Sequence, residues 1–172
     1  MAVNPAEDIV NVWLQENCGY FTRQNINVPK VRGGKGKEID ILGINISGEK
    51  IWVEVTVSPN PYSTKKEEQV KKMVSIVKRK FDNEKEKEVK RIFGTKKFHK
   101  MFVYSKKVFN GETDKKEKQF SERIKGRGVE AIEFEKVLNE TIEKLNYYSV
   151  DPTRIFLYYA KSYLQPKSTS KR

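Results

Sequence analysis

The chain has 172 residues, of which 37% are hydrophobic and 34% charged, so it suits one globular domain with a lean core. The single cysteine excludes an intrachain disulfide framework and a Cys-clustered zinc site, and the single histidine excludes a His-rich metal site. No stretch approaches the roughly 20 apolar residues of a membrane span, and Met1 to Ala6 lacks a signal-type apolar run. We therefore expect a cytoplasmic (intracellular) protein without membrane contact.

The net charge of +12 is concentrated after residue 60. Residues 1–60 hold six basic and seven acidic residues, whereas residues 61–172 hold 29 basic and 16 acidic residues. A domain this basic is typical of nucleic-acid binding. The alternative is a solvated Lys/Glu-rich surface of the kind that thermophilic proteins favour.

Apolar periodicity and turn signals predict the order α-β-β-β-α-β-α-β-α-α. A first helix opens at Asn4-Pro5 and ends at Cys18-Gly19. The further elements are strands at 20–28, 38–46 and 50–57, a largely helical stretch at 64–93 that bends or ends within 82–88, a strand at 98–104, a helix at 115–125, a strand at 129–134, and helices at 135–145 and 151–164. This order predicts an α/β fold with a mixed central sheet and helices on both faces. We expect residues 1–164 to form one domain and residues 165–172 a disordered basic tail.

Two carboxylates lie inside apolar strands, where they are costly unless they are paired or bind metal. Asp40 lies between two isoleucines and Glu54 between two valines, and both are equally far from the Ser47-Gly48 turn. In an antiparallel hairpin such residues face each other on one side of the sheet, so a cation between them is expected. Carboxylate oxygens suit Mg²⁺ or Mn²⁺, and the Val55 carbonyl could add a further oxygen. The alternative is a solvated face with ordinary acids.

The stretches Gly36-Lys37-Glu38-Ile39-Asp40-Ile41-Leu42 and Ile51-Trp52-Val53-Glu54-Val55-Thr56 resemble the core of the PD-(D/E)XK nuclease superfamily. This superfamily has the restriction-endonuclease-like fold and includes archaeal Holliday-junction resolvases. Its αβββαβ core is the order predicted for residues 5–104, so the resemblance covers roughly the first 105 residues.

The resemblance implies roles for particular residues. Asp40 matches the metal-binding Asp of the motif, and Glu54 matches its (D/E) position. Glu7 on the first helix matches an extra glutamate that many members carry near the metal, although an acid in the first turn of a helix also has a purely structural explanation.

The position of the motif's lysine is taken by Thr56, which can hold a water but cannot supply charge. Lys71 or Lys72 on the following helix, or Lys35 in the glycine-rich loop, are candidates to replace it. Lys71 and Lys72 point about 100° apart on a helix, so at most one should reach the metal. Lys37 lies an odd number of residues from Asp40 and should point away.

Basic residues near this hairpin predict contacts with phosphates. The loop 32–37 combines three glycines with basic side chains, and the helix after the hairpin adds more. The alternatives are a plain flexible hairpin loop and a solvated helix face. The candidate nucleic-acid-binding residues are Arg32, Lys35, Lys37, Lys71, Lys72, Lys78 and Arg79. Aromatic residues near the C-terminus favour packing or a homodimer surface over platforms for base stacking, namely Tyr147, Tyr148, Tyr158, Tyr159 and Tyr163.

Three hypotheses follow. The first is a Mg²⁺- or Mn²⁺-dependent endonuclease that hydrolyses phosphodiester bonds of DNA. The second keeps the nuclease fold but assigns it to an inactive DNA-binding or assembly protein, since the motif's lysine is missing. The third is a basic RNA-binding protein of unrelated fold, for which no RNP-type aromatic motif is present.

Overall fold

A computed structural model describes residues 4–29, 36–58, 60, 63, 65, 68–145 and 151–164, without the side chains of residues 159 and 162–164. The helices are α1 (Pro5–Glu16), α2 (Gln69–Lys80), α3 (Asn83–Phe93), α4 (Thr113–Lys125), α5 (Phe134–Lys144) and α6 (Pro152–Leu164), with a 3-10 turn η2 (Lys106–Val108). The strands are β1 (Tyr20–Val28), β2 (Lys37–Asn45), β3 (Lys50–Thr56), β4 (His99–Tyr104) and β5 (Val129–Glu133). The predicted succession of helices and strands is confirmed, with one predicted helix divided in two.

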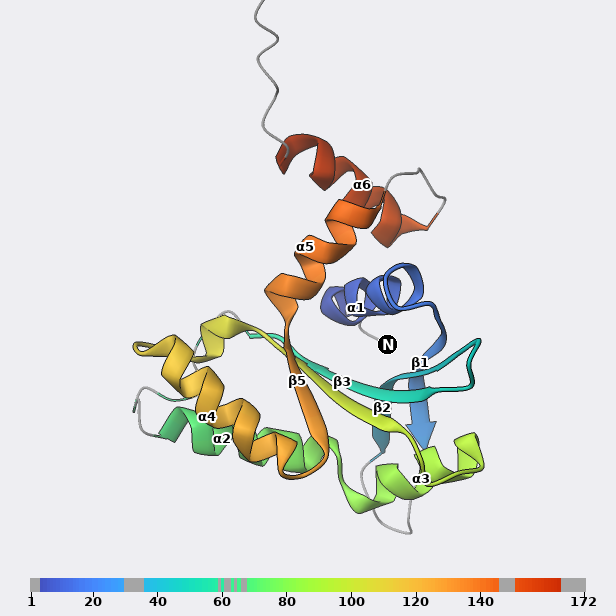
Figure 1. Cartoon of the computed structure of the whole chain (residues 1–172), viewed down its shortest axis with the longest axis vertical. Coiled ribbons are helices and arrows are strands. Elements are labelled where there is room, and N and C mark those ends of the chain that lie inside the picture. The colour runs from blue at the N-terminus through green and yellow to red at the C-terminus, as the bar shows by residue number, and fades with distance from the viewer. Residues whose placement is uncertain are drawn as a thin grey trace, which may run out of the picture.

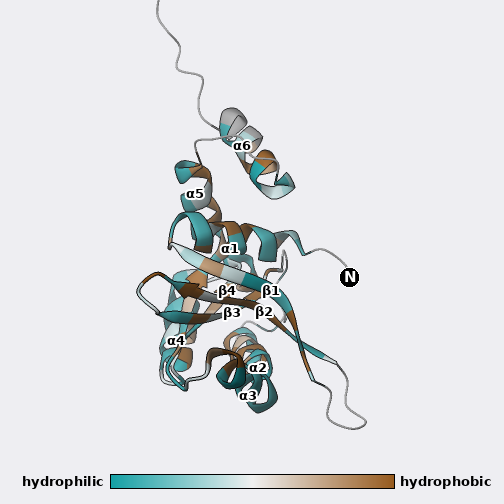
Figure 2. Cartoon of the chain, turned by 90° about the vertical axis from the view of Figure 1, so that its right-hand side faces the viewer, coloured by the Kyte–Doolittle hydropathy of each residue, from teal (hydrophilic) through white to brown (hydrophobic). Residues whose placement is uncertain are grey.

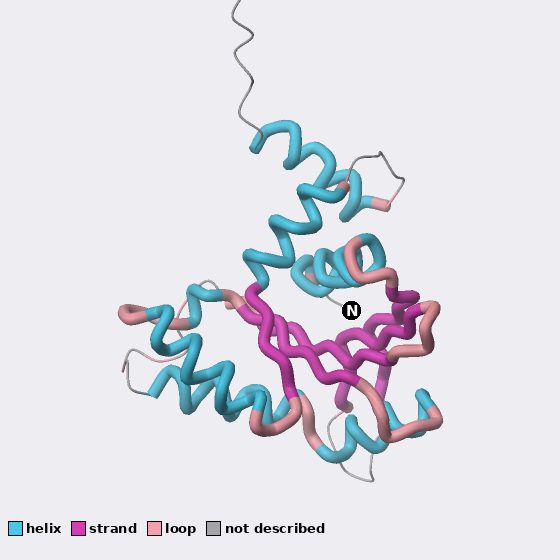
Figure 3. Tube along the Cα trace, in the orientation of Figure 1, coloured by secondary structure: helices cyan, strands magenta, loops and turns pink. Residues whose placement is uncertain are grey.

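In the described part of the chain, the five strands form one sheet in the order β1-β2-β3-β4-β5 (Figures 1 and 3). The first three strands pair antiparallel, as a meander. The helical crossovers then make β4 parallel to β3, and β5 parallel to β4. The predicted mixed α/β sheet is therefore confirmed.

Helices cover both faces of the sheet, because its inner strands are apolar on both sides. On one face α1 and α5 pack over Val53, Val55 and Val103. On the other face α2 and α4 pack over Phe102, and α3 packs over Trp52. Figure 2 shows the hydrophobic residues of the central strands between these helix layers. Helix α6 lies on the outer side of α1 and α5, and its Leu157 packs in a hydrophobic cluster with residues of both. None of the described helices is long and apolar enough to cross a membrane.

The helical stretch predicted over 64–93, with a bend or end within 82–88, is interrupted at Phe81, just before that range. Phe81 leaves the helical conformation, and Asp82 is extended. The Asp82 carboxylate then accepts hydrogen bonds from the backbone N–H groups of Glu84 and Lys85, which starts α3. The charged stretch after residue 82 is therefore helical, and the change of direction at Phe81–Asp82 brings α3 against β2.

Candidate active site

The turn between β2 and β3 sets the register that brings two acids together. Gly48 adopts a φ of 80°, which favours glycine, and its N–H donates to the Asn45 carbonyl. Ile41 consequently pairs with Val53, and Asp40 and Glu54 occupy the next two positions. The register predicted from the symmetry about the turn is confirmed.

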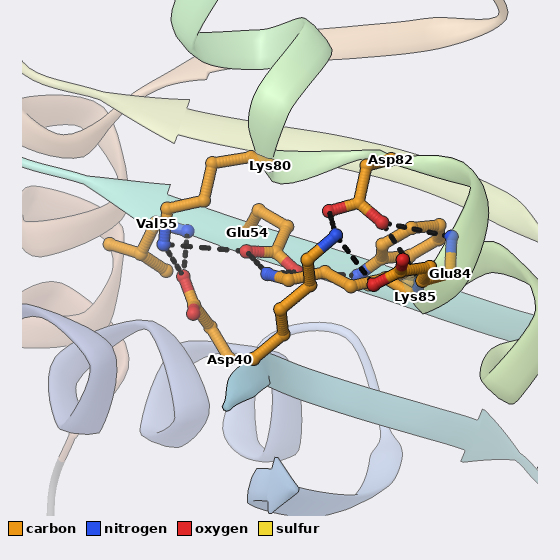
Figure 4. Close-up of polar contacts among 9 residues, drawn as sticks. Asp40, Glu54, Val55, Lys80, Asp82, Glu84 and Lys85 are labelled. Atoms are coloured by element: carbon orange, nitrogen blue, oxygen red, sulfur yellow. Dashed lines mark hydrogen bonds and ion pairs between the residues drawn. The ribbon is translucent and has the colours of Figure 1, made fainter. Parts of the chain in front are cut away.

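Asp40 is held by a backbone group and an ammonium group. Its Oδ2 accepts a hydrogen bond from the Val55 N–H at 2.7 Å and one from Lys80 Nζ at 2.7 Å (Figure 4). The backbone pairing of β2 with β3 runs as far as Ile41 and Val53, so the Asp40 side chain satisfies a β3 amide beyond the end of that ladder. Asp40 is 4% exposed, which makes these charged and hydrogen-bonded contacts necessary.

Glu54 is completely buried and has three donors around it. Lys85 Nζ lies 2.8 Å from Oε1 and 2.9 Å from Oε2, and Trp52 Nε1 donates to Oε1 at 2.8 Å. Lys80 Nζ lies 3.3 Å from Oε2, so the ammonium that binds Asp40 also contacts Glu54. The cation expected between the two carboxylates is therefore, in this structure, the Lys80 side chain.

Burial and charge shift the protonation equilibria here. Burial, followed by the charge of Asp40, raises the pKa of Glu54 to about 7, despite the nearby lysines. Burial lowers the pKa of Lys80, but the charges of Asp40 and Glu54 outweigh it, so that the net shift is upward. The ammonium is thus stabilised by the same carboxylates that it neutralises.

Three further residues predicted for the site lie around this pair. Burial and then the charge of Asp40 raise the pKa of Glu7, which places Glu7 within electrostatic range of Asp40. The Thr56 Oγ1 is buried and has no hydrogen-bond partner in the described part of the chain. Val55 contributes its N–H to Asp40, whereas a metal-binding role for its carbonyl remains a prediction.

The basic candidates are distributed differently from the expectation. Lys71 and Lys72 are exposed at the start of α2, and the cations that contact the acid pair come from Lys80 and Lys85 instead. The prediction that Lys37 points to the opposite face from Asp40 is wrong, because Lys37 pairs with Asp82 at 2.9 Å and Glu84 at 2.7 Å at the start of α3, the helix that also supplies Lys85 to the site. The side chains of Lys78 and Arg79 are exposed on α2, and Arg32 and Lys35 lie outside the described residues.

Sequence reasoning missed Lys80 and Lys85, although a signal existed. Val70, Met73 and Val77 form the buried stripe of α2, and the next position at helical spacing is Lys80. Lys85 lies one turn before the buried Val89 on α3. A lysine on the apolar face of a helix needs a buried acid, and the strand acids supply it.

Comparison with known proteins leaves the family open: neither a scan against protein-family models nor a search of curated proteins found a match. Within the described residues, no group of three or more His, Cys, Asp or Glu side chains is arranged to hold a metal ion. Any metal site here would therefore rest on the two facing carboxylates, backbone oxygens and water.

Proposed function

We propose that the chain is a divalent-metal-dependent DNA endonuclease of the restriction-endonuclease-like fold. The proposal is supported by an αβββαβ order of elements in which two helices, α2 and α3, form the crossover, by the carboxylate pair in register on β2 and β3, and by the basic surface on the adjacent helices. It assigns hydrolysis of the phosphodiester bond to the end of the sheet where Asp40 lies opposite Glu54.

The observation that carries the proposal is the cation shared by these carboxylates. Lys80 Nζ contacts Asp40 at 2.7 Å and Glu54 at 3.3 Å, so both acids converge on one cation-binding position. Two carboxylates in this arrangement suit Mg²⁺ or Mn²⁺ through their oxygens. The Thr56 Oγ1, which has no hydrogen-bond partner among the described residues, lies on the same strand as Glu54 and supplies a polar group that a water could satisfy.

The residues of the site have different roles in the proposed reaction. A divalent ion held by Asp40 and Glu54 would lower the pKa of a bound water and polarise the phosphate. An ion held between the carboxylates would displace the Lys80 ammonium from that position, and Lys80 beside it would have the charge to do the work of the motif's missing lysine. Lys85 is a positioning residue, which holds the buried Glu54 carboxylate through both oxygens.

A second candidate is a DNA-binding protein that has kept this fold without catalysis. It is favoured by one observation: Lys80 and Lys85 already neutralise a Glu54 side chain that is fully buried. In that case the four charged groups are an internal ion-pair network, and DNA contacts only the surface.

The deciding experiment is cleavage of a panel of branched, nicked and linear DNA with Mg²⁺ or Mn²⁺. We expect Asp40→Asn to abolish cleavage and Lys80→Ala to slow it by about 10²-fold or more, as for the loss of one preorganised electrostatic group. Lys87→Ala is the matched control, because Lys87 is an exposed lysine on α3 outside the site. Lys71→Ala and Lys72→Ala should affect DNA affinity more than rate.

Metal binding is measured separately by thermal melting. A ligand that binds only the native state stabilises it by about 2.7 kcal/mol at a hundredfold excess over Kd. Coincident melts with and without Mn²⁺, for wild type and Asp40→Asn alike, would refute the metal site. If the wild-type protein cleaves nothing while Thr56→Lys does, the second candidate is correct.

A further inference from the structure

Two adjoining hollows lie where the end of α2, the start of β4 and the turn between α4 and β5 meet. Their volumes are about 330 and 480 Å³, and Lys100 and Val129 line both of them. We call them together the basic groove, defined by the basic residues Lys78, His99, Lys100, Lys125 and Arg127. These residues come from three separate segments, so the fold gathers charge that is dispersed in the sequence.

The positive charge of the basic groove is largely uncompensated. Lys78, Lys125 and Arg127 are exposed, and none of them forms an ion pair with any described residue. Lys100 pairs with Glu86 and lies 5.7 Å from the Trp52 ring centre. Two acids also line the hollows, Asp82 and Glu130, of which Asp82 is already paired with Lys37. An anionic ligand would therefore meet a net excess of cations.

The basic groove adjoins the candidate active site. Phe81 lines the groove, and its ring centre lies 4.7 Å from that of Trp52. Trp52 in turn donates a hydrogen bond to Glu54. Aromatic side chains thus lie between the groove and the carboxylate pair, and α2 and α3 contribute residues to both.

We propose that the basic groove binds the phosphodiester backbone of DNA beside the cleavage site, an inference that rests on the proposed function. The flexible ammonium groups of Lys78 and Lys125 act as adaptable point charges, whereas the Arg127 guanidinium can bind a phosphate through two parallel hydrogen bonds. Contacts of this kind hold a strand without reading its bases, so binding is tolerant of sequence.

The test compares two triple variants in binding to a fluorescent DNA duplex without metal, over a range of salt concentrations. The groove variant is Lys78→Gln/Lys125→Gln/Arg127→Gln. The matched control is Lys107→Gln/Lys144→Gln/Arg23→Gln, which removes the same charge from exposed residues that form no ion pair with any described residue. We expect the groove variant to bind about tenfold or more weakly. Its slope of log affinity against log salt should become shallower by about 0.9 for each phosphate that the groove no longer neutralises.

The inference is overturned if the two triple variants lose affinity equally, or if the groove variant keeps the wild-type salt slope. Thermal melts check that both variants are folded, and each single groove substitution should give about one third of the change in slope. Failure of the proposed function has a different signature. In that case wild-type protein does not cleave DNA with Mn²⁺, whereas the selective loss of binding by the groove variant persists.

Discussion

At the scale of single residues, the candidate site consists of two carboxylates and two ammonium groups that form ion pairs. Asp40 and Glu54 come from the sheet, and Lys80 and Lys85 come from α2 and α3, which cover one face of it. Removing one partner of a buried ion pair costs about 3–5 kcal/mol, because the remaining charge is left without compensation. The pairing therefore holds the helices on the sheet as well as shaping the site.

This reasoning predicts the effect of Lys85→Met on the free energy of unfolding. We expect a loss of about 3–5 kcal/mol at pH 8 in urea denaturation, since the fully buried Glu54 carboxylate loses its nearest cation. The double variant Lys85→Met/Glu54→Gln should recover most of this loss, because the charge that needed Lys85 is gone. Lys87→Met, on the same helix but exposed, should change stability by no more than about 0.5 kcal/mol.

The loss of stability caused by Lys85→Met should also depend on pH. Burial raises the pKa of Glu54 from its ordinary value to about 7. Between an unfolded pKa near 4.5 and that folded value, the native protein keeps a proton that the unfolded chain has released. The contribution of Glu54 to stability is thus full below this window and declines as pH rises through it. The penalty of Lys85→Met should accordingly be smaller at pH 5.5 than at pH 8, and an equal penalty at both would contradict this account.

At the scale of elements, the boundary between α2 and α3 decides where both lysines lie. Asp82 caps α3 through two backbone N–H groups and also pairs with Lys37 on β2. Partial burial raises the pKa of Asp82, but the hydrogen bonds from Lys37 and from these N–H groups outweigh it and lower the pKa. The cap fixes the first turn of α3, which contains Lys85.

Asp82 substitutions should therefore follow an order. Asp82→Ala removes the cap, worth about 0.5–2 kcal/mol, and also the ion pair, whereas Asp82→Asn keeps an oxygen that can cap. For a chain of this size each kcal/mol lowers the melting temperature by about 2–4 °C. We expect thermal melts to rank wild type above Asp82→Asn, and Asp82→Asn above Asp82→Ala. Glu84→Gln, which also contacts Lys37 but does not cap, should melt near wild type.

The sheet and the acid pair could be predicted because both depend on local rules. Turn chemistry sets the register of β2 on β3, and a carboxylate inside an apolar strand is conspicuous. Lys80 and Lys85 were harder to assign although they lie at helical spacing from buried residues, because both helices are polar on most of their surface and carry several other basic residues. Gln69 illustrates the difficulty: so polar a helix favours a solvated side chain, but Gln69 is 1% exposed and accepts hydrogen bonds from the Asn110 N–H and Lys116.

Several of the predicted features involve residues outside the part of the chain that the structure describes. The glycine-rich loop with Arg32 and Lys35 and the C-terminal tail fall outside that part. The homodimer surface expected on the C-terminal helices also stays a prediction, because of its five tyrosines only Tyr158 has a described side chain. Each depends on the arrangement of exposed side chains, which turn and periodicity rules do not specify.

At the scale of the whole molecule, the two helix layers differ in charge. Helices α2, α3 and α4 hold fourteen basic and six acidic residues, whereas α1, α5 and α6 hold four basic and six acidic residues. The sheet separates the layers (Figures 1 and 3), so the excess positive charge of the helices lies on the face covered by α2, α3 and α4. A polyanion approaching from solution is attracted to the basic layer, which is also the layer that supplies Lys80 and Lys85.

This asymmetry predicts which face DNA covers. In lysine acetylation footprinting with saturating duplex DNA, we expect protection of exposed lysines on the basic layer, such as Lys71, Lys78 and Lys125. Lys144 on α5 should remain as reactive as in the free protein, because it lies on the opposite layer. Protection should weaken as salt rises, since phosphate contacts release counterions and lose affinity. Uniform protection of both layers would show that charge alone does not orient the molecule, and protection of Lys144 alone would place the DNA on the wrong face for the Asp40–Glu54 site.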